Sequence, residues 1–209
     1  MKALARPLLA VLAIALATWL VALHALPLFV MRVATSRIRS GSLAELRAAS
    51  GAPGARGGLR VDPARAATIL ERDGWNVALP APPTTAESRT IVRPSPDLLY
   101  VACVYDLSKG PLLVRAPHTP TYLSLSAFAD DTDNFFAMND RGPGGTNGLA
   151  MLLVPPGDAS SPPAIAAGAT RVESPSLRGI VLARVRVDHP DRVPELVELQ
   201  RKVACDPVR

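Results

Sequence analysis

The feature that most constrains this chain is an uncharged stretch of 24 residues, Leu8–Met31, close to the N-terminus. As an α-helix it would span about 36 Å, which exceeds the roughly 30 Å hydrocarbon core of a bilayer. Arg6 and Arg32 flank the stretch closely. We therefore predict that residues 1–39 form a membrane anchor whose helix covers about residues 8–31.

A cleaved signal peptide is the alternative interpretation of this segment. Its apolar region would be about 7–15 residues long and would end in an A-x-A-like site. Here the run is longer, and the matches (Ala13-Ile14-Ala15 and Ala15-Leu16-Ala17) lie inside it. Length and flanking charges favour an uncleaved helix, which we expect to kink at Pro27 near its end.

The charge distribution sets the class of partner. The net charge is +5, and residues 1–39 hold five basic and no acidic side chains. Residues 40–209 hold 18 of each sign, so the excess lies where lysine and arginine meet lipid headgroups. A nucleic-acid-binding protein carries its basic patch on the folded domain. The lipid bilayer is the expected partner, and nucleic acid is not.

After the anchor, residues 40–58 are rich in glycine and alanine and are predicted to be a linker. Within it, Leu43–Ala49 could form two helical turns. Residues 59–209 are the predicted domain. Asp62 and Pro63 are an N-cap and a first-turn proline, so a short helix should begin there and end near Arg72.

Seven later segments have the composition of short strands separated by Pro/Gly turns. They are 98–107, 112–116, 121–129, 134–138, 149–154, 170–173 and 179–187. A closing helix from about Asp191 has one apolar stripe, made of Val193, Leu196, Val197 and Val203. The predicted fold class is α+β: a transmembrane helix, then a mainly antiparallel sandwich or barrel-like domain with a C-terminal helix.

Three stretches carry a family resemblance: IVRPSPDLLYVACVYDLSKGPLLVRAP followed by Tyr122, then LLVPPG, then GIVLARVRVDHPDRVPELVELQRK. They resemble the bacterial family called domain of unknown function 1254 over about residues 88–205. Ser95 departs from it, since the family more often has Asn there. The resemblance implies an exported domain and, because many members carry a second domain, a companion protein that supplies it. It implies no established reaction.

Arg93, Asp97, Tyr100 and Asp106 are the candidate ligand-binding residues. Arg93 and Asp97 flank a turn that enters a buried strand, so their charged groups and the Tyr100 hydroxyl could line a pocket at the end of the sheet. Alternatively, Asp97 and Asp106 organise turns by accepting backbone N–H groups. No catalytic residue is assigned, and whether the chain is an enzyme stays open.

No metal site or cofactor is predicted. An acidic segment suggests cation binding through Asp130, Asp131, Asp133, Asn134 and Asp140. However, an EF-hand loop would need a third ligand where Phe135 stands, so a solvated turn is favoured. His118 and His189 are far apart in sequence and show no zinc spacing.

Cys103 lies in the predicted buried strand at 98–107, and Cys205 lies near the C-terminus. Outside the cytoplasm the two could form a disulfide. Two separate buried thiols are the slightly favoured interpretation, because Cys103 has the character of a small core residue.

Two functional hypotheses follow. One is a membrane-tethered, extracytoplasmic interaction module that acts with the companion protein. The other is an envelope enzyme or small-ligand-binding protein that uses a pocket near Arg93–Tyr100. Three basic side chains directly after the helix, against two before it, favour a cytoplasmic domain. The family resemblance favours the bacterial inner membrane with a periplasmic domain, and we follow it.

Overall fold

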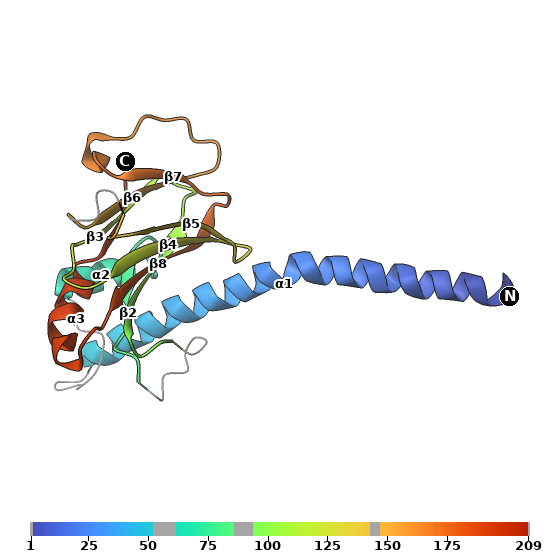
Figure 1. The fold of residues 1–209 in the computed structure, drawn as a ribbon, viewed down its shortest axis with the longest axis horizontal. Coiled ribbons are helices and arrows are strands. Elements are labelled where there is room, and N and C mark those ends of the chain that lie inside the picture. The colour runs from blue at the N-terminus through green and yellow to red at the C-terminus, as the bar shows by residue number, and fades with distance from the viewer. Residues whose placement is uncertain (1, 52–61, 86–93, 143–146, 209) are drawn as a thin grey trace.

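A computed structural model describes residues 2–51, 62–85, 94–142 and 147–208. Helix α1 (Lys2–Gly51) runs without interruption through Pro7 and Pro27, and its N-terminal half projects away from the domain as a single rod (Figure 1). Within the described residues, α1 is the only helix with a stretch long and apolar enough to cross a membrane. Its side chains from Pro7 to Leu26 are exposed, as expected for a helix that is surrounded by lipid.

The domain is built from two packed β-sheets. The larger has the order β1 (Ala78–Pro80), β2 (Leu98–Asp106), β8 (Arg178–Arg186), β4 (Leu123–Ala129) and β5 (Asn134–Asn139). The smaller has the order β7 (Thr170–Glu173), β6 (Leu149–Val154), β3 (Leu112–Ala116) and β9 (Ala204–Pro207). Every pair is antiparallel except β6 with β7. The predicted α+β class is confirmed.

Alternating side chains of β2 explain how the sheets pack. Leu99, Val101 and Tyr105 point into a core that both sheets share. Ala102 and Val104 point to the outer face of the five-stranded sheet and are buried there too. A strand that is buried on both faces has a continuous run of apolar residues in its sequence, and residues 98–107 show this pattern.

The seven predicted strands are present, and two further strands, β1 and β9, were missed. Both are short and contain a proline, so their sequences resemble turns. Helix α2 (Pro63–Glu71) is capped by Asp62, which accepts a hydrogen bond from the backbone N–H of Arg65, as predicted.

Helix α3 (Val193–Arg201) follows a 3-10 turn at Pro190–Arg192. A second such turn lies at Ala164–Ala166. The predicted apolar stripe of α3 is wrong for Val203, which follows the helix and is buried in the shared core.

The linker prediction is wrong for residues 40–51, which are the last turns of α1. Leu43 and Leu46 are buried against Ile69 of α2 and Leu79 of β1. A segment rich in small residues stays helical here because its two leucines, three positions apart, face an apolar surface. Residues 52–58 lie outside the described part of the chain.

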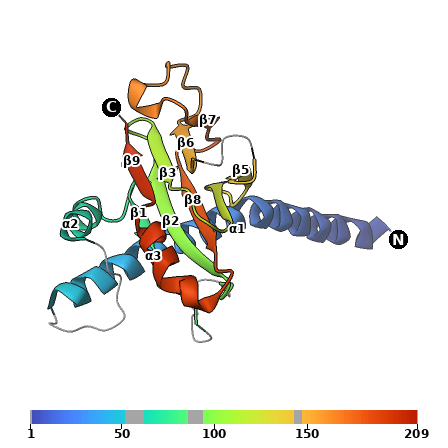
Figure 2. The ribbon, with the colours of Figure 1, turned by 60° about the vertical axis from the view of Figure 1, so that its left-hand side comes forward.

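Helix α1 crosses the outer face of the five-stranded sheet from the β4 side to the β1 side (Figure 2). Met31 packs on Ile180 of β8, with Phe128 of β4 partly buried beside them. Further along the helix, Leu43 and Leu46 share a buried cluster with Leu79 of β1. The helix that carries the apolar segment is therefore also a structural element of the domain.

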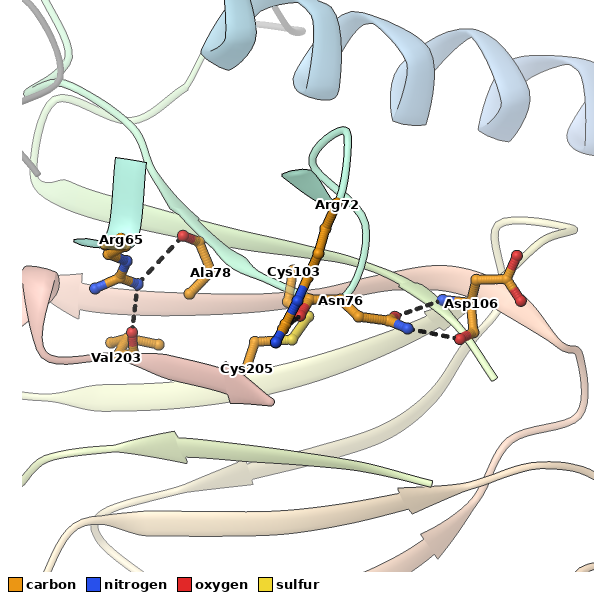
Figure 3. Close-up of a disulfide and its surroundings, with 8 residues drawn as sticks. All are labelled: Arg65, Arg72, Asn76, Ala78, Cys103, Asp106, Val203 and Cys205. Atoms are coloured by element: carbon orange, nitrogen blue, oxygen red, sulfur yellow. Dashed lines mark hydrogen bonds between the residues drawn. A yellow bond between two sulfur atoms is a disulfide. The ribbon is translucent and has the colours of Figure 1, made fainter. Parts of the chain in front are cut away.

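The closing segment of the chain is tied to the rest of the domain by Arg65 of α2 (Figure 3). Its guanidinium donates to the carbonyls of Ala78 (3.2 Å), Val203 (2.6 Å) and Arg201. Burial lowers the pKa of this guanidinium below the ordinary arginine value. One side chain thereby joins α2, β1 and the turn between α3 and β9.

Cys103 of β2 and Cys205 of β9 form a disulfide, with their Cα atoms 6.3 Å apart (Figure 3). The interpretation as two separate thiols is therefore wrong. Both residues face the core, one from each sheet, so packing the two sheets brings them together although 102 positions separate them. The disulfide links the sheets through the shared core.

Removing this bond should destabilise the domain strongly. Closing a loop of about 100 residues restricts the unfolded chain, so Cys103→Ala or Cys205→Ala should lower the free energy of unfolding by about 3–5 kcal/mol. Urea unfolding of the full chain in detergent measures this change. The double variant should resemble either single variant, because all three lose the same bond. A double variant within about 1 kcal/mol of wild type would contradict the prediction.

Candidate functional site

Two of the predicted ligand-binding residues lie at one end of β2. Asp97 is exposed just before the strand, and its carbonyl accepts the backbone N–H of Val187 (2.8 Å). The hydroxyl of Tyr100 accepts the backbone N–H of Ser95 (2.9 Å). Arg93 lies outside the described residues. The structure thus brings Asp97 and Tyr100 to the same end of the sheet.

Asp106 lies at the other end of β2, about 20 Å along the strand from Tyr100. It therefore does not share a site with Tyr100. Its carboxylate accepts the backbone N–H of Ser108 (3.0 Å), so its predicted alternative role as a turn organiser is confirmed. At Asp97 the turn is held by a different group: the Ser95 hydroxyl, not the Asp97 carboxylate, accepts a backbone N–H, which is that of Asp97 (3.4 Å).

Tyr100 belongs to a polar row that runs across four strands on the outer face of the five-stranded sheet. Directly paired neighbours in this row are Tyr100 on β2, Arg184 on β8, Ser124 on β4 and Asn139 on β5. Neighbouring strands are about 4.8 Å apart, so the row is about 14 Å long. We call it the Tyr100 row.

Arg184 is the charged centre of the Tyr100 row. Its guanidinium donates to the Ser126 hydroxyl (3.4 Å), and within the described residues no carboxylate lies within 4.0 Å of it. A guanidinium beside hydroxyl and amide groups can bind a carboxylate or phosphate. Sequence reasoning missed Arg184. The signal was present, because arginines alternate with apolar residues in 183–186, which places them on the face away from the core.

A second cluster lies where α1 meets the domain, and we call it the Trp75 junction. Arg39 of α1 stacks on the Trp75 ring at 4.2 Å from the centroid, and Arg178 of β8 approaches it at 5.4 Å. Arg39 also forms an ion pair with Asp73 and donates to the Asp73 carbonyl (2.7 Å). Arg178 pairs with Asp106 (2.9 Å). Cation–π contacts and ion pairs together connect α1 with β8 and β2.

The two residues on either side of Trp75, Gly74 and Asn76, also shape the Trp75 junction. Gly74 has φ +73°, and a Cβ there would lie 3.1 Å from Cγ of Arg39. The glycine thus permits the close approach of α1. The Asn76 side chain donates to the Asp106 carbonyl (2.8 Å) and accepts its N–H (2.7 Å) (Figure 3).

The charge of Asp106 is stabilised at this junction. Partial burial by itself would raise the pKa of Asp106. Hydrogen bonds from Ser108 and the ion pair with Arg178 outweigh that effect, so the pKa lies below the ordinary aspartate value. Asp106 is therefore an anion that helps to hold Arg178 beside Trp75.

The acidic segment 130–133 forms the turn between β4 and β5. Asp131 accepts the backbone N–H of Asp133 (3.1 Å), and Thr132 adopts a positive φ of 77°. Asp140 lies at the opposite end of β5. Among the residues that the structure describes, no group of three or more His, Cys, Asp or Glu side chains is arranged to hold a metal ion.

Comparisons with known proteins identify a family and a fold. The model of the family described as "Protein of unknown function (DUF1254)" matches residues 75–207. The crystal structure of the VPA0106 protein from Vibrio parahaemolyticus is similar, with a TM-score of 0.51 and 15% identity over 68% of this chain and 32% of that one. An uncharacterized protein from Burkholderia cenocepacia has a TM-score of 0.40 and 14% identity, over 85% and 49% of the two chains. No curated protein matches.

The ion pair at the Trp75 junction should make stability depend on pH. Because the folded-state pKa of Asp106 is depressed, its contribution is present above the unfolded value of about 3.9 and is lost as pH falls through the folded value. Asp106→Asn should lower Tm by about 1–3 °C at pH 7, and this difference should shrink below about pH 4.

Thermal unfolding of the full chain between pH 3 and 7 measures this effect. Asp97→Asn is the matched control, because the Asp97 side chain is exposed and forms no ion pair in the described structure. Identical Tm values for Asp106→Asn and wild type at every pH would contradict the assignment.

Proposed function

We propose that this chain, which belongs to the DUF1254 family, is a membrane-tethered interaction module that presents its domain to a protein partner at a fixed position beside the bilayer. The family description assigns no function, so the proposal is derived from the geometry. The observation that carries it is the continuity of α1 from the apolar segment onto the outer face of the sheet.

This continuity fixes the domain relative to the helix. Met31, Leu43 and Leu46 are all buried, and Arg39 adds the contacts of the Trp75 junction between them. A domain on a flexible linker would sample many heights and orientations. A partner that is itself bound to the membrane gains affinity from a fixed placement, because less orientational freedom is lost on binding. A small diffusible substrate gains nothing from it.

We propose that this helix is retained as an uncleaved anchor. Residues 31–46 complete the apolar surface of the domain, so the C-terminal half of α1 belongs to the fold. The helix is long enough to span a bilayer and to dock on the domain in one piece.

The partner that we propose is a separate protein carrying the second domain found in many members of the family. The chain spans 32% of the length of the VPA0106 protein, whose similarity shows the fold alone. A second domain in such a companion would have to meet this one beside the membrane, where a rigid placement is useful.

Loosening the domain should weaken the complex while the anchor remains in the membrane. Leu43→Ala with Leu46→Ala removes the buried contacts beyond the apolar segment. Affinity purification in mild detergent should recover the companion several-fold less with this variant than with wild type. Ala44→Ser with Ala48→Ser, on the exposed side of the same turns, is the control and should recover it fully. A wild-type protein that is strictly monomeric and free of companions would refute the proposal.

For location, we propose the bacterial inner membrane with the N-terminus in the cytoplasm and the domain in the periplasm. The disulfide between Cys103 and Cys205 supports this arrangement, because disulfides persist in oxidising compartments. A C-terminal alkaline phosphatase fusion, which is active only after export, should be active in intact cells. Activity instead from a reporter that works only in the cytoplasm would overturn the arrangement.

A second candidate function is the binding of a small anionic ligand at the Tyr100 row. The specific observation is the Arg184 guanidinium, half-buried and without a carboxylate partner in the described residues. Phosphate and small dicarboxylates are suitable probes for calorimetry. Arg184→Gln should abolish any binding, and Arg171→Gln, an arginine on β7 of the other sheet, should not. Equal binding by both variants would exclude the site.

A further inference from the structure

The order in which α1 meets the strands determines which edge of the domain faces the bilayer. Nearer its N-terminal side, Met31 of the helix shares a buried cluster with Ala102 of β2 and Ile180 of β8, beside Phe128 of β4. Nearer its C-terminal side, Leu43 and Leu46 share a buried cluster with Leu79 of β1. The sheet order is β1-β2-β8-β4-β5, so β5 lies beyond β4 in the direction of the apolar segment. Both views place β5 on the side of the domain toward the N-terminal half of α1 (Figures 1 and 2).

The position of β5 along the helix follows from simple dimensions. Met31, the last residue of the apolar segment, packs with Ile180 of β8 and Ala102 of β2. β5 lies two strands beyond β8, a distance of about 10 Å, which equals about six residues of helix rise. Six residues before Met31 lies Ala25. Side chains of α1 are exposed up to Leu26, Pro27 and Leu28 are partly covered, and Phe29 and Val30 are exposed again. β5 therefore lies level with the last two turns of the apolar segment.

The chemistry of β5 suits the interface between headgroups and hydrocarbon. Its sequence from Asn134 to Asn139 is NFFAMN, and Phe135, Phe136 and Met138 are only partly buried. Within the described residues its outer edge pairs with no strand. Unpaired backbone groups need polar partners and cannot enter hydrocarbon, whereas partly exposed phenylalanines favour leaving water. Both demands are met among lipid headgroups.

We propose that β5, together with the turn 130–133, is a lipid-contacting edge that rests on the headgroups of the bilayer in which α1 is anchored. The proposal rests on the membrane tethering of the proposed function and adds the orientation of the domain. Contact with lipid also covers an exposed strand edge that would otherwise offer a template for aggregation. Three aspartates in the turn are repelled by anionic lipid, so the helix and the apolar side chains, not charge, maintain the contact.

Depth-dependent fluorescence quenching tests this orientation in the full chain. Both native cysteines are in the disulfide, so a single introduced cysteine can carry an environment-sensitive fluorophore. Ala137→Cys labels the exposed centre of β5, and Ala67→Cys labels the exposed face of α2 at the far side of the sheet. Ala17→Cys labels the apolar segment. Each protein is reconstituted in phosphatidylcholine vesicles with nitroxides in the headgroup or on the acyl chain.

We expect headgroup nitroxides to quench the label at residue 137 several-fold more than the label at residue 67, and acyl-chain nitroxides to quench the label at residue 17. Equal quenching at residues 137 and 67, with residue 17 still in lipid, would overturn the orientation and leave the tether intact. A label at residue 17 that is not quenched by lipid would instead refute the membrane tether itself. The two failures are therefore distinguishable.

Discussion

The packing of one helix on the outer face of a β-sheet is the interaction on which the rest of this structure depends. A two-sheet domain needs apolar side chains on the inner faces only, yet β2 and β8 also bury apolar residues on their outer face, and α1 covers these. Because the same helix continues into the apolar segment, the contact that completes the domain would also set its distance from a membrane that the segment spans. Stability and placement are thus consequences of one interface.

Much of the fold was predictable because its signals are local. An uncharged run between arginines, a proline after an aspartate cap and seven segments of strand composition each lie within a few consecutive residues. The short strands β1 and β9 were not predictable in this way, since three or four residues with a proline carry no periodicity. They form because Arg65 and the neighbouring strands supply partners from elsewhere in the chain.

The candidate site shows the same division between local and tertiary information. The turn role of Asp106 could be predicted, because Asx turns depend on residues two positions apart. The separation of Asp106 from Tyr100 follows from the length of the predicted strand. The pocket hypothesis did not take that length into account when it grouped the two residues. The Tyr100 row and the Trp75 junction depend on the register of β2 against β8 and on the docking of α1. Single-sequence patterns contain neither.

The disulfide has a consequence for the order in which the domain is completed. Cys103 enters the core with β2, but its partner lies 102 residues later, on the last strand of the smaller sheet. The thiol of Cys103 must therefore remain reachable until β9 has been synthesised and paired with β3. Until that moment the two sheets have no covalent link other than the backbone that joins their strands. The disulfide therefore forms only after both sheets have assembled, and a chain truncated before residue 205 would lack it.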